Sequence, residues 1–386
     1  MAALINARPS LFMDVSLPKW VFIQLLEHCN LRCRMCYEWG DNGAYLARPA
    51  LRRLDVEVIK KIIEDCRPAR PRYDLYGGEP LLYPQFAEVL RAIRLAGSEV
   101  QLPTNGTLLA KNAEVLVEHG ATRIWVSLDG PPEINDRQRG AGVFARAVEG
   151  IDRIHALRQQ RGGGPPLIGI STVVTPLNYR HLEEFFFDAL DLSKVDCVSL
   201  ELQAYLTERD HQHYERVLRT EFGVAQAPVA RGFVNDPAIF ADMDYGLIAR
   251  QVAHLAEHCH RKGLYFNTYP KVTSEDNIRK YFSADWLAMS AVKTRCSFPW
   301  ISTEINARGE VTTCHAFYDL SLGNVHQSSL ADIWRGERYA RYRSHLRRQL
   351  FPICQSCVLF YEDYRQLSQA PSGAESTGGA RRAANQ

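Results

Sequence analysis

Cys29, Cys33 and Cys36 form a CxxxCxxC pattern near the start of the chain. Three thiolates at this spacing can hold a cubane 4Fe–4S cluster and leave one iron without a protein ligand. A fully ligated cluster mainly transfers electrons, whereas an open iron can also bind a chelating substrate. A structural zinc loop is the alternative, but zinc motifs favour CxxC pairs and this triplet has no fourth ligand close by.

A second group of cysteines lies in the C-terminal part of the chain and consists of Cys296, Cys314, Cys354 and Cys357. Four thiols are enough to saturate one iron–sulfur cluster or one zinc ion, and the spacing leaves both open. A saturated cluster has no open iron for a substrate. Electron transfer is therefore the role predicted for a cluster at this second site.

The remaining cysteines have structural explanations. Cys66 and Cys259 each continue an apolar stripe at helical spacing, so both are predicted to be core thiols. Cys197 begins a predicted strand, at the end away from the chemistry. None of these thiols is an obvious hydrogen-atom donor, which argues against a redox-neutral epimerase.

Composition narrows the function classes. The chain has 386 residues, with 46 Lys and Arg against 44 Asp and Glu, so it lacks the basic character of a nucleic-acid-binding protein. No apolar run is long enough for a membrane span or a signal peptide, and we expect a cytoplasmic protein with reduced thiols. One basic segment is interpreted as a solvated helix face, with a partner surface as the alternative. Its residues are Arg338, Arg341, Arg343, Arg347 and Arg348.

The elements that must position the cysteines repeat as strand, loop and helix from residue 20 to about residue 263. This alternation predicts a parallel sheet with right-handed crossovers, and six units predict an α/β fold with an open, partial (β/α)6 TIM-like barrel. The predicted strands are 21–27, 72–76, 99–102, 123–128, 167–174 and 197–205. The predicted helices are 55–66, 84–96, 109–119, 144–159 and 181–190, with a final helix at 245–262.

The segments with chemical character all follow strand ends. Segments 29–36, 77–80, 104–106 and 127–130 lie at or just after the ends of four predicted strands. Because parallel sheets of this kind place their chemistry at the carboxyl ends of the strands, we expect these segments to meet at one rim.

The chain divides into three predicted regions. Residues 1–265 form the barrel, with an irregular polar insertion or lid at 207–240. Residues 266–367 form a second, cysteine-rich module. Residues 368–386 are rich in Ser, Gly and Ala and are predicted to be disordered.

Together with a second motif, the cysteine triplet resembles the signature of radical S-adenosylmethionine (radical SAM) enzymes. The second motif is the family's Gly-Gly-Glu-Pro sequence, present as Gly77, Gly78, Glu79 and Pro80 after the second predicted strand. The resemblance implies that this loop binds the amino group of SAM. Its glycines permit close backbone approach, and an acidic side chain suits an ammonium partner.

Further SAM contacts are implied by the resemblance. Asn105 and Ser127 occupy strand ends that usually meet the ribose or the carboxylate of SAM. Arg139 resembles the Arg of an HDxxR element that holds the SAM carboxylate, although position 135 holds Asn instead of His. Met35 stands where an aromatic residue is usual, two residues before Tyr37, and its thioether is expected to pack on adenine.

The second module resembles the SPASM extension of radical SAM enzymes. The order Cys296-x12-Gly309-x4-Cys314, followed by Cys354-x2-Cys357, carries this resemblance. No cysteine follows Cys357, so the match is to the shortened, single-cluster form called twitch. The implied cofactors are two 4Fe–4S clusters and SAM. The implied partner is a low-potential electron donor such as flavodoxin or ferredoxin.

Four side chains are predicted to face the substrate. Glu201 and Tyr205 share the polar face of the sixth predicted strand, Asp129 ends the fourth, and Glu27 has the same parity as Cys29. An inward carboxylate can act as a base or can accept hydrogen bonds from substrate hydroxyls. The alternative is that these groups are polar fillers satisfied by their neighbours.

The resemblance implies that SAM is cleaved to a 5′-deoxyadenosyl radical, which removes a hydrogen atom from the substrate. We expect net oxidation of a small metabolite, such as an amino sugar alcohol. A radical SAM maturase that modifies a ribosomally made peptide is the alternative. A zinc-binding scaffold protein is the more distant, non-enzyme alternative.

Overall fold

The computed structural model describes residues 16–290, 296–314 and 317–357. Their strands form one ten-stranded sheet in the order β10-β9-β8-β1-β2-β3-β4-β5-β6-β7. Strands β1 to β7 are parallel to their neighbours, β8 is parallel to β1, and β9 and β10 continue the edge in antiparallel fashion. The strands are β1 (Trp20–Gln24), β2 (Arg72–Tyr76), β3 (Val100–Thr104), β4 (Arg123–Ser127), β5 (Leu167–Val174), β6 (Cys197–Leu202), β7 (Tyr265–Tyr269), β8 (Ser302–Ile305), β9 (Glu310–Thr312) and β10 (Gly323–Asn324).

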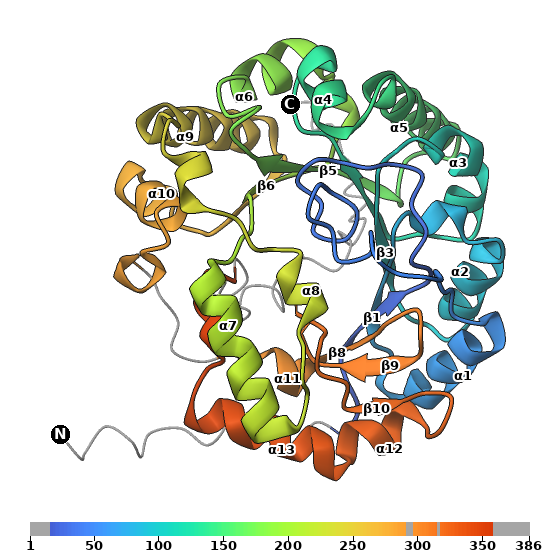
Figure 1. The fold of residues 1–386 in the computed structure, drawn as a ribbon. Coiled ribbons are helices and arrows are strands. Elements are labelled where there is room, and N and C mark those ends of the chain that lie inside the picture. The colour runs from blue at the N-terminus through green and yellow to red at the C-terminus, as the bar shows by residue number, and fades with distance from the viewer. Residues whose placement is uncertain (1–15, 291–295, 315–316, 358–386) are drawn as a thin grey trace, which may run out of the picture.

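Helices cover the outer face of the curved sheet (Figure 1). They are α1 (Val56–Cys66), α2 (Phe86–Leu95), α3 (Leu109–Glu118), α4 (Pro132–Arg139), α5 (Val143–Gln160), α6 (Leu182–Glu184), α9 (Tyr245–Lys262) and α10 (Glu275–Phe282). Helix α1 shows why they form: Asp55 caps it by accepting a hydrogen bond from the Glu57 amide, and Ile59, Ile62 and Cys66 are buried at helical spacing. Cys66 is therefore a core thiol, as predicted, and Cys259 is equally buried in α9.

The predicted partial (β/α)6 barrel is confirmed, and the sheet extends beyond it at both edges. β7 pairs with β6, so the boundary expected at residue 265 falls at the start of a further strand. That strand, Tyr-Phe-Asn-Thr-Tyr, lies at the sheet edge and its first residue is exposed. Its sequence therefore lacks the apolar run that marked the buried strands. β8, from the second module, pairs with β1, and β9 and β10 extend the sheet from β8 to its other edge.

The segment 207–240, expected to be irregular, is largely helical, while its interpretation as an insertion or lid stays a prediction. This connecting segment, residues 207–240, contains α7 (Glu208–Val217), a π-helical turn (Leu218–Phe222), α8 (Pro228–Arg231) and a 3-10 helix (Pro237–Phe240). The Thr207 hydroxyl caps α7 at the Asp210 amide, a signal that the polar composition of the segment obscured. The connecting segment joins the two modules, because Asp319 accepts hydrogen bonds from the amides of Val229 and Ala230 at 2.7 and 3.0 Å.

The second module packs against the barrel beside α1 and the connecting segment. It contains α11 (Phe298–Ile301), β8 to β10, α12 (Leu330–Arg335), α13 (Glu337–Arg348) and a 3-10 helix (Pro352–Ser356). The predicted disordered tail, 368–386, lies outside the described residues. None of the described helices has the length and apolar character needed to cross a bilayer.

Candidate active site and cluster sites

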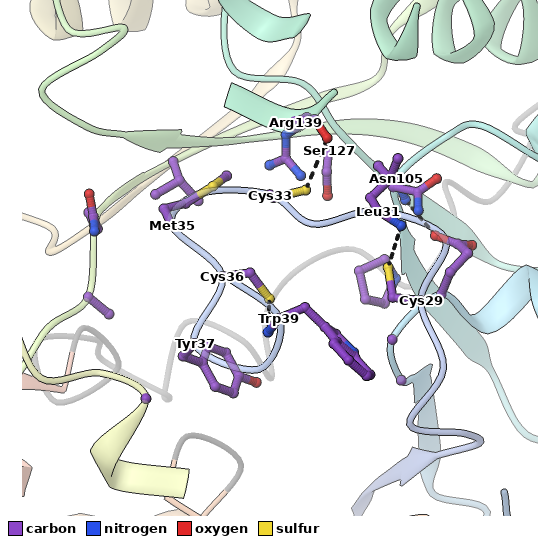
Figure 2. A pocket seen from close by; sticks show the side chains of 18 of the residues that line it. Cys29, Leu31, Cys33, Met35, Cys36, Tyr37, Trp39, Asn105, Ser127 and Arg139 are labelled. Atoms are coloured by element: carbon purple, nitrogen blue, oxygen red, sulfur yellow. Dashed lines mark hydrogen bonds between the residues drawn. The ribbon is translucent and has the colours of Figure 1, made fainter. Parts of the chain in front are cut away.

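A cavity of about 290 Å³ lies at the carboxyl ends of the parallel strands, at the lower end of the size range of small-molecule sites. The cysteine triplet lines it, and so do all nine residues predicted to contact SAM. Figure 2 shows the three thiols on one loop, with Arg139 near Cys33. The nine residues are Met35, Tyr37, Gly77, Gly78, Glu79, Pro80, Asn105, Ser127 and Arg139.

The environment of the three thiols suits cluster ligands. Backbone amides approach two of them, from Leu31 to Cys29 Sγ at 3.4 Å and from Trp39 to Cys36 Sγ at 3.3 Å. Burial raises the pKa of Cys29 to about 11 and that of Cys36 to about 12. The thiols are therefore protonated without a metal, and iron binding must displace their protons. Three thiols held by one loop fit a cluster with one open iron.

The Gly77–Gly78 loop lies directly against the cysteine loop. The Gly78 amide donates to Leu26 O at 3.0 Å, and the Glu79 amide donates to His28 O at 2.9 Å. A Cβ atom on Gly78 would lie 2.1 Å from His28 O. Glycine is therefore required at this position by the close approach of two backbones.

The Glu79 carboxylate makes its hydrogen bonds inside the protein. It accepts from the Thr104 hydroxyl at 2.8 Å, the Asn105 amide at 2.8 Å and the Leu81 amide at 3.1 Å, and the side chain is fully buried. Burial raises the pKa of Glu79 to about 7, although these hydrogen bonds lower it. The carboxylate thus joins the loops after β2 and β3. Glu79 also lines the cavity, and its contact with the SAM amino group stays a prediction.

Asp129 orients Arg139 from outside the cavity. Asp129 is fully buried and lies 2.6 Å from Arg139 Nε. It also accepts hydrogen bonds from the Gln138 side chain at 2.7 Å and the Val173 amide at 2.9 Å. Asn135, at the position where the family has His, accepts from the Asp129 amide at 3.0 Å. Asp129 is therefore bound within the protein and does not line the cavity, whereas Arg139 does.

The other predicted SAM contacts lie around the same space. The Asn105 side chain donates to Asn30 Oδ1 at 2.9 Å, which fixes the loop after β3 to the cysteine loop. The Tyr37 ring stacks on Phe233 with 4.2 Å between ring centroids. The structure brings these residues together, and their contact with SAM stays a prediction.

Glu201 is the predicted catalytic residue that reaches the cavity. Its carboxylate is partly buried in β6 and has no hydrogen-bond partner among the described residues. Desolvation alone raises the pKa of Glu201 to about 7. The group can therefore exchange a proton near neutral pH, which is what a general base requires.

Tyr205 does not lie at the cavity. β6 ends at Leu202, so the strand alternation that placed Tyr205 beside Glu201 stops before it. The Tyr205 side chain is buried, and its hydroxyl donates to Tyr281 O at 2.9 Å. Its ring packs on Trp286. Tyr205 is a core residue in this fold.

Glu27 is also bound by other residues of the protein, away from the cavity. Its buried carboxylate forms ion pairs with Arg48 and, at 2.9 Å, with Arg308 of the second module. It accepts a further hydrogen bond from the Arg52 amide at 2.8 Å. Glu27 therefore links the barrel to the second module and does not line the cavity.

The sequence analysis missed the contribution of the connecting segment to the cavity. Gly232, Phe233 and Asn235 line the cavity beside Tyr37. A Cβ atom on Gly232 would lie 2.1 Å from Tyr37 O, so this glycine lets the segment approach the cysteine loop. The sequence signal that could have indicated this contribution was the isolated Gly-Phe pair in a polar stretch.

The second cysteine site, Cys296, Cys314, Cys354 and Cys357, lies beneath α13. Burial raises the pKa of Cys354, and the other three thiols raise it further because they are near enough to interact with it. The Phe317 amide approaches Cys314 Sγ at 3.3 Å. Within the described residues, no three His, Cys, Asp or Glu side chains converge as the ligands of a single ion would. Four neighbouring thiols are enough to hold one iron–sulfur cluster.

A parallel partial barrel with three thiols on the loop after β1 and a Gly-Gly-Glu-Pro loop after β2 defines a radical SAM site. The family comparisons agree: residues 23–189 match the radical SAM superfamily, and residues 296–358 match SPASM, an iron–sulfur cluster-binding domain. The chain belongs to the radical SAM enzymes that carry a C-terminal SPASM module. The cofactors that this family implies are SAM, a 4Fe–4S cluster in the barrel and iron–sulfur binding in the SPASM module.

Curated relatives include one that aligns over most of its length. The chain is 26% identical over 366 residues to the tungsten-containing aldehyde ferredoxin oxidoreductase cofactor-modifying protein of Pyrococcus furiosus, covering 88% of this chain and 87% of that protein. It is 34% identical to GTP 3′,8-cyclase of Microcystis aeruginosa, but that match covers 42% of this chain and half of the cyclase.

Solved structures share the fold. SuiB of Streptococcus suis, bound to its precursor peptide SuiA, superposes with a TM-score of 0.60 at 17% identity, over 92% of this chain and 74% of SuiB. The structure of anSMEcpe with bound AdoMet gives a TM-score of 0.55 at 15% identity, over 89% of this chain and 87% of that chain. At these identities the likeness concerns the fold alone.

Proposed function

We propose that this radical SAM enzyme oxidises its substrate, with the second cysteine site as the acceptor of the substrate's electron. When bound, the first cluster and SAM supply a carbon-centred radical that removes one hydrogen atom. The observation that carries the proposal is Glu201, an unpaired carboxylate on the cavity wall whose pKa is raised to about 7. It provides the proton acceptor that an oxidation needs.

Different residues of the chain hold SAM, form the cavity wall and exclude water in this proposal. Arg139, held by Asp129, offers a cation for the SAM carboxylate, while the 77–80 loop and Asn105 define the wall near the cysteine triplet. Met35 and Tyr37 offer apolar surface for the adenine. Phe233, stacked on Tyr37, helps to exclude water from the cavity.

The electrons and protons balance in this scheme. The substrate loses one hydrogen atom to the radical, one proton to Glu201 and one electron to the second cluster. SAM cleavage consumes one electron. Each turnover therefore returns as many electrons as it uses, and the net reaction converts SAM and substrate into methionine, 5′-deoxyadenosine, oxidised substrate and one proton.

A small metabolite is the substrate class that we propose. The cavity of about 290 Å³, lined in part by the connecting segment, must hold SAM as well as the substrate, which leaves little room for a large substrate. The Pyrococcus relative, which aligns over nearly the whole chain, is named for modifying a cofactor. That name supports a non-peptide substrate for this chain as well.

A peptide is the second candidate substrate, and a neighbouring cavity favours it. This second cavity, of about 220 Å³, shares five residues with the first, namely Met35, Cys36, Gln203, Gly232 and Asn235. The exposed Asn42 side chain lines it and offers an amide that can pair with peptide amides. SuiB, which has a similar fold, binds a precursor peptide in its crystal structure, and this is consistent with a peptide substrate here.

The first test is anaerobic reconstitution with measurement of iron, sulfide and 5′-deoxyadenosine. We expect about eight irons per chain, and about four when either cysteine group is changed to Ala. The triplet variant should lose 5′-deoxyadenosine formation, whereas the C354A/C357A variant should keep abortive SAM cleavage and lose substrate oxidation. Zinc in place of iron, without SAM cleavage, would refute the enzyme proposal and leave a structural metal protein.

A second assay separates the substrate classes and tests the oxidation. The ultrafiltrate of a cell extract should stimulate 5′-deoxyadenosine formation equally before and after protease treatment if the substrate is a metabolite. Loss of stimulation after protease treatment would favour a peptide. Because each turnover returns the electron that it uses, the amount of product formed should exceed the amount of reductant electrons supplied. A requirement for one reductant electron per molecule of product would contradict oxidation.

A further inference from the structure

The outer face of α13 carries a row of exposed arginines. Arg338, Arg341 and Arg348 recur at helical spacing on one side of the helix, and Arg347 lies beside them. None of these four forms an ion pair with an acidic side chain in the part of the chain that the structure describes. The nearby acids are Glu337 on the same helix and Glu221, whose carboxylate is bound by His345 and Gln349.

Local helix stability does not explain this row. Arg338 is the second residue of α13, where a positive charge opposes the helix dipole. Arg338 and Arg341 are three residues apart, and like charges at that spacing destabilise a helix. Only Arg347 and Arg348, in the last turn, are favoured by the dipole. The arrangement therefore costs stability at its N-terminal half.

The inner face of the same helix covers the second cysteine site. Tyr342 of α13 is buried, and the thiols of Cys314 and Cys354 help to raise its pKa, so both lie close to its hydroxyl. The His345 ring stacks on Phe351 with 4.3 Å between centroids, immediately before the 3-10 helix that carries Cys354. One helix, about 10 Å thick, thus separates the arginines from the cysteines.

The position of α13 leaves this face open to a partner. In Figure 1, α13 lies at the rim of the molecule with α12 and α7, on the side opposite α3 and α5. Arg341 donates to Glu221 O and lies over the Phe222 ring, and Arg347 lies over the Trp300 ring. All four arginines are nevertheless exposed among the described residues. A protein docked there would approach the second cysteine site more closely than one docked on the helices of the barrel.

We propose that the arginine face of α13 docks an acidic one-electron carrier protein, of the ferredoxin type. This inference rests on the proposed redox role of the second site. One electron passes from the reduced second cluster to the oxidised carrier, so that the cluster is oxidised by one electron and the carrier is reduced by one. Complementary charge steers the encounter and makes it sensitive to ionic strength.

The test measures binding of an acidic ferredoxin to the reconstituted protein at several salt concentrations. The charge-reversal variant R338E/R341E/R348E should bind about tenfold or more weakly, and its affinity should respond less to salt. The matched control is R91E/K111E/R250E, which makes the same charge change at exposed residues of α2, α3 and α9. The control should bind as the wild type does.

Electron transfer gives a second readout. Stopped-flow oxidation of the reduced second cluster by ferredoxin should slow in the α13 variant, while oxidation by a small uncharged mediator stays unchanged. Circular dichroism and dithionite-driven SAM cleavage should match the wild type, because none of the changed residues lines the cavity.

Three outcomes would overturn the docking proposal: unchanged binding in the α13 variant, equal weakening in both triple variants, or binding of RNA or anionic vesicles in place of ferredoxin. Failure of the proposed function looks different. In that case the second site takes up no redox-active iron, while salt-dependent ferredoxin binding at α13 is still seen.

Discussion

Replacing Gly78 with Ala tests whether the two loops of the SAM site depend on backbone contact. The new Cβ atom would lie 2.1 Å from His28 O and 2.7 Å from Cys29 N. A relaxed carbon–oxygen contact needs about 3.3 Å, so the loops must separate by about 1.2 Å. Both neighbours are backbone atoms, and no side-chain rotation can relieve the clash.

The expected effect is large on activity and moderate on stability. Overpacking of this kind costs about 1–3 kcal/mol of folding free energy. Movement of the 77–80 loop also displaces Cys29, because the Glu79 amide is hydrogen-bonded to His28 O at 2.9 Å. A misplacement of about 1 Å can lower a rate about 100-fold. We therefore expect 5′-deoxyadenosine formation to fall by about that factor.

The assay is the initial rate of 5′-deoxyadenosine formation, with SAM affinity and iron content measured in parallel. Gly246→Ala in α9 is the matched control, since its Cβ would meet the flexible ends of Glu275 and Arg250, at 3.0 and 3.2 Å, and would make an ordinary contact with Asp244 Oδ1 at 3.4 Å. The control should keep wild-type activity. Wild-type SAM affinity and rate in Gly78→Ala would refute the argument that contact between the loops positions SAM.

Three further predictions concern single carboxylates. Since the pKa of Glu201 is raised to about 7, oxidation should rise with pH through that value in the wild type. Glu201→Gln should abolish product formation but keep SAM affinity. If the variant still oxidised substrate with the pH profile of the wild type, Glu201 would be excluded as the base. Glu304 is buried in β8, and desolvation raises its pKa from 4.5 to about 8. The stability associated with its protonated form is complete below pH 4.5 and is lost as pH rises toward 8, so Glu304→Gln should become more stable relative to the wild type over that interval. Denaturant titrations of the metal-free protein measure this difference, and parallel curves for the two proteins would contradict it. Glu27→Gln weakens ion pairs whose arginines are partly exposed, and should cost about 1–3 kcal/mol by urea denaturation. Glu57→Gln, at an exposed ion pair, is its control and should cost less than about 0.5 kcal/mol; equal losses would mean that the link to the second module contributes nothing.

The sequence predicted the barrel and the contents of its rim because both depend on short-range patterns. Strand and helix periodicity are visible within a few residues, and a parallel sheet brings the ends of successive strands together. The cysteine triplet, the 77–80 loop, Asn105, Ser127 and Arg139 therefore line one cavity, as expected. Local periodicity did not mark β7, because an edge strand with polar residues lacks the pattern of a buried one.

The roles of individual polar side chains depended on partners far away in the chain. Glu27 has the parity of Cys29, yet Arg308, 281 residues later, binds its carboxylate. Tyr205 has the parity of Glu201, but β6 ends before it and the side chain enters the core.

By itself, the sequence determined the class of chemistry, because ligand types and their covalent spacing limit which cluster can bind. Only the tertiary structure decided which carboxylate stays available. Glu27, Glu79 and Asp129 are bound by arginines, hydroxyls or amides, whereas Glu201 faces the cavity without a partner among the described residues. The free energy of a buried charge depends on every group around it, and those groups come together only when the chain folds.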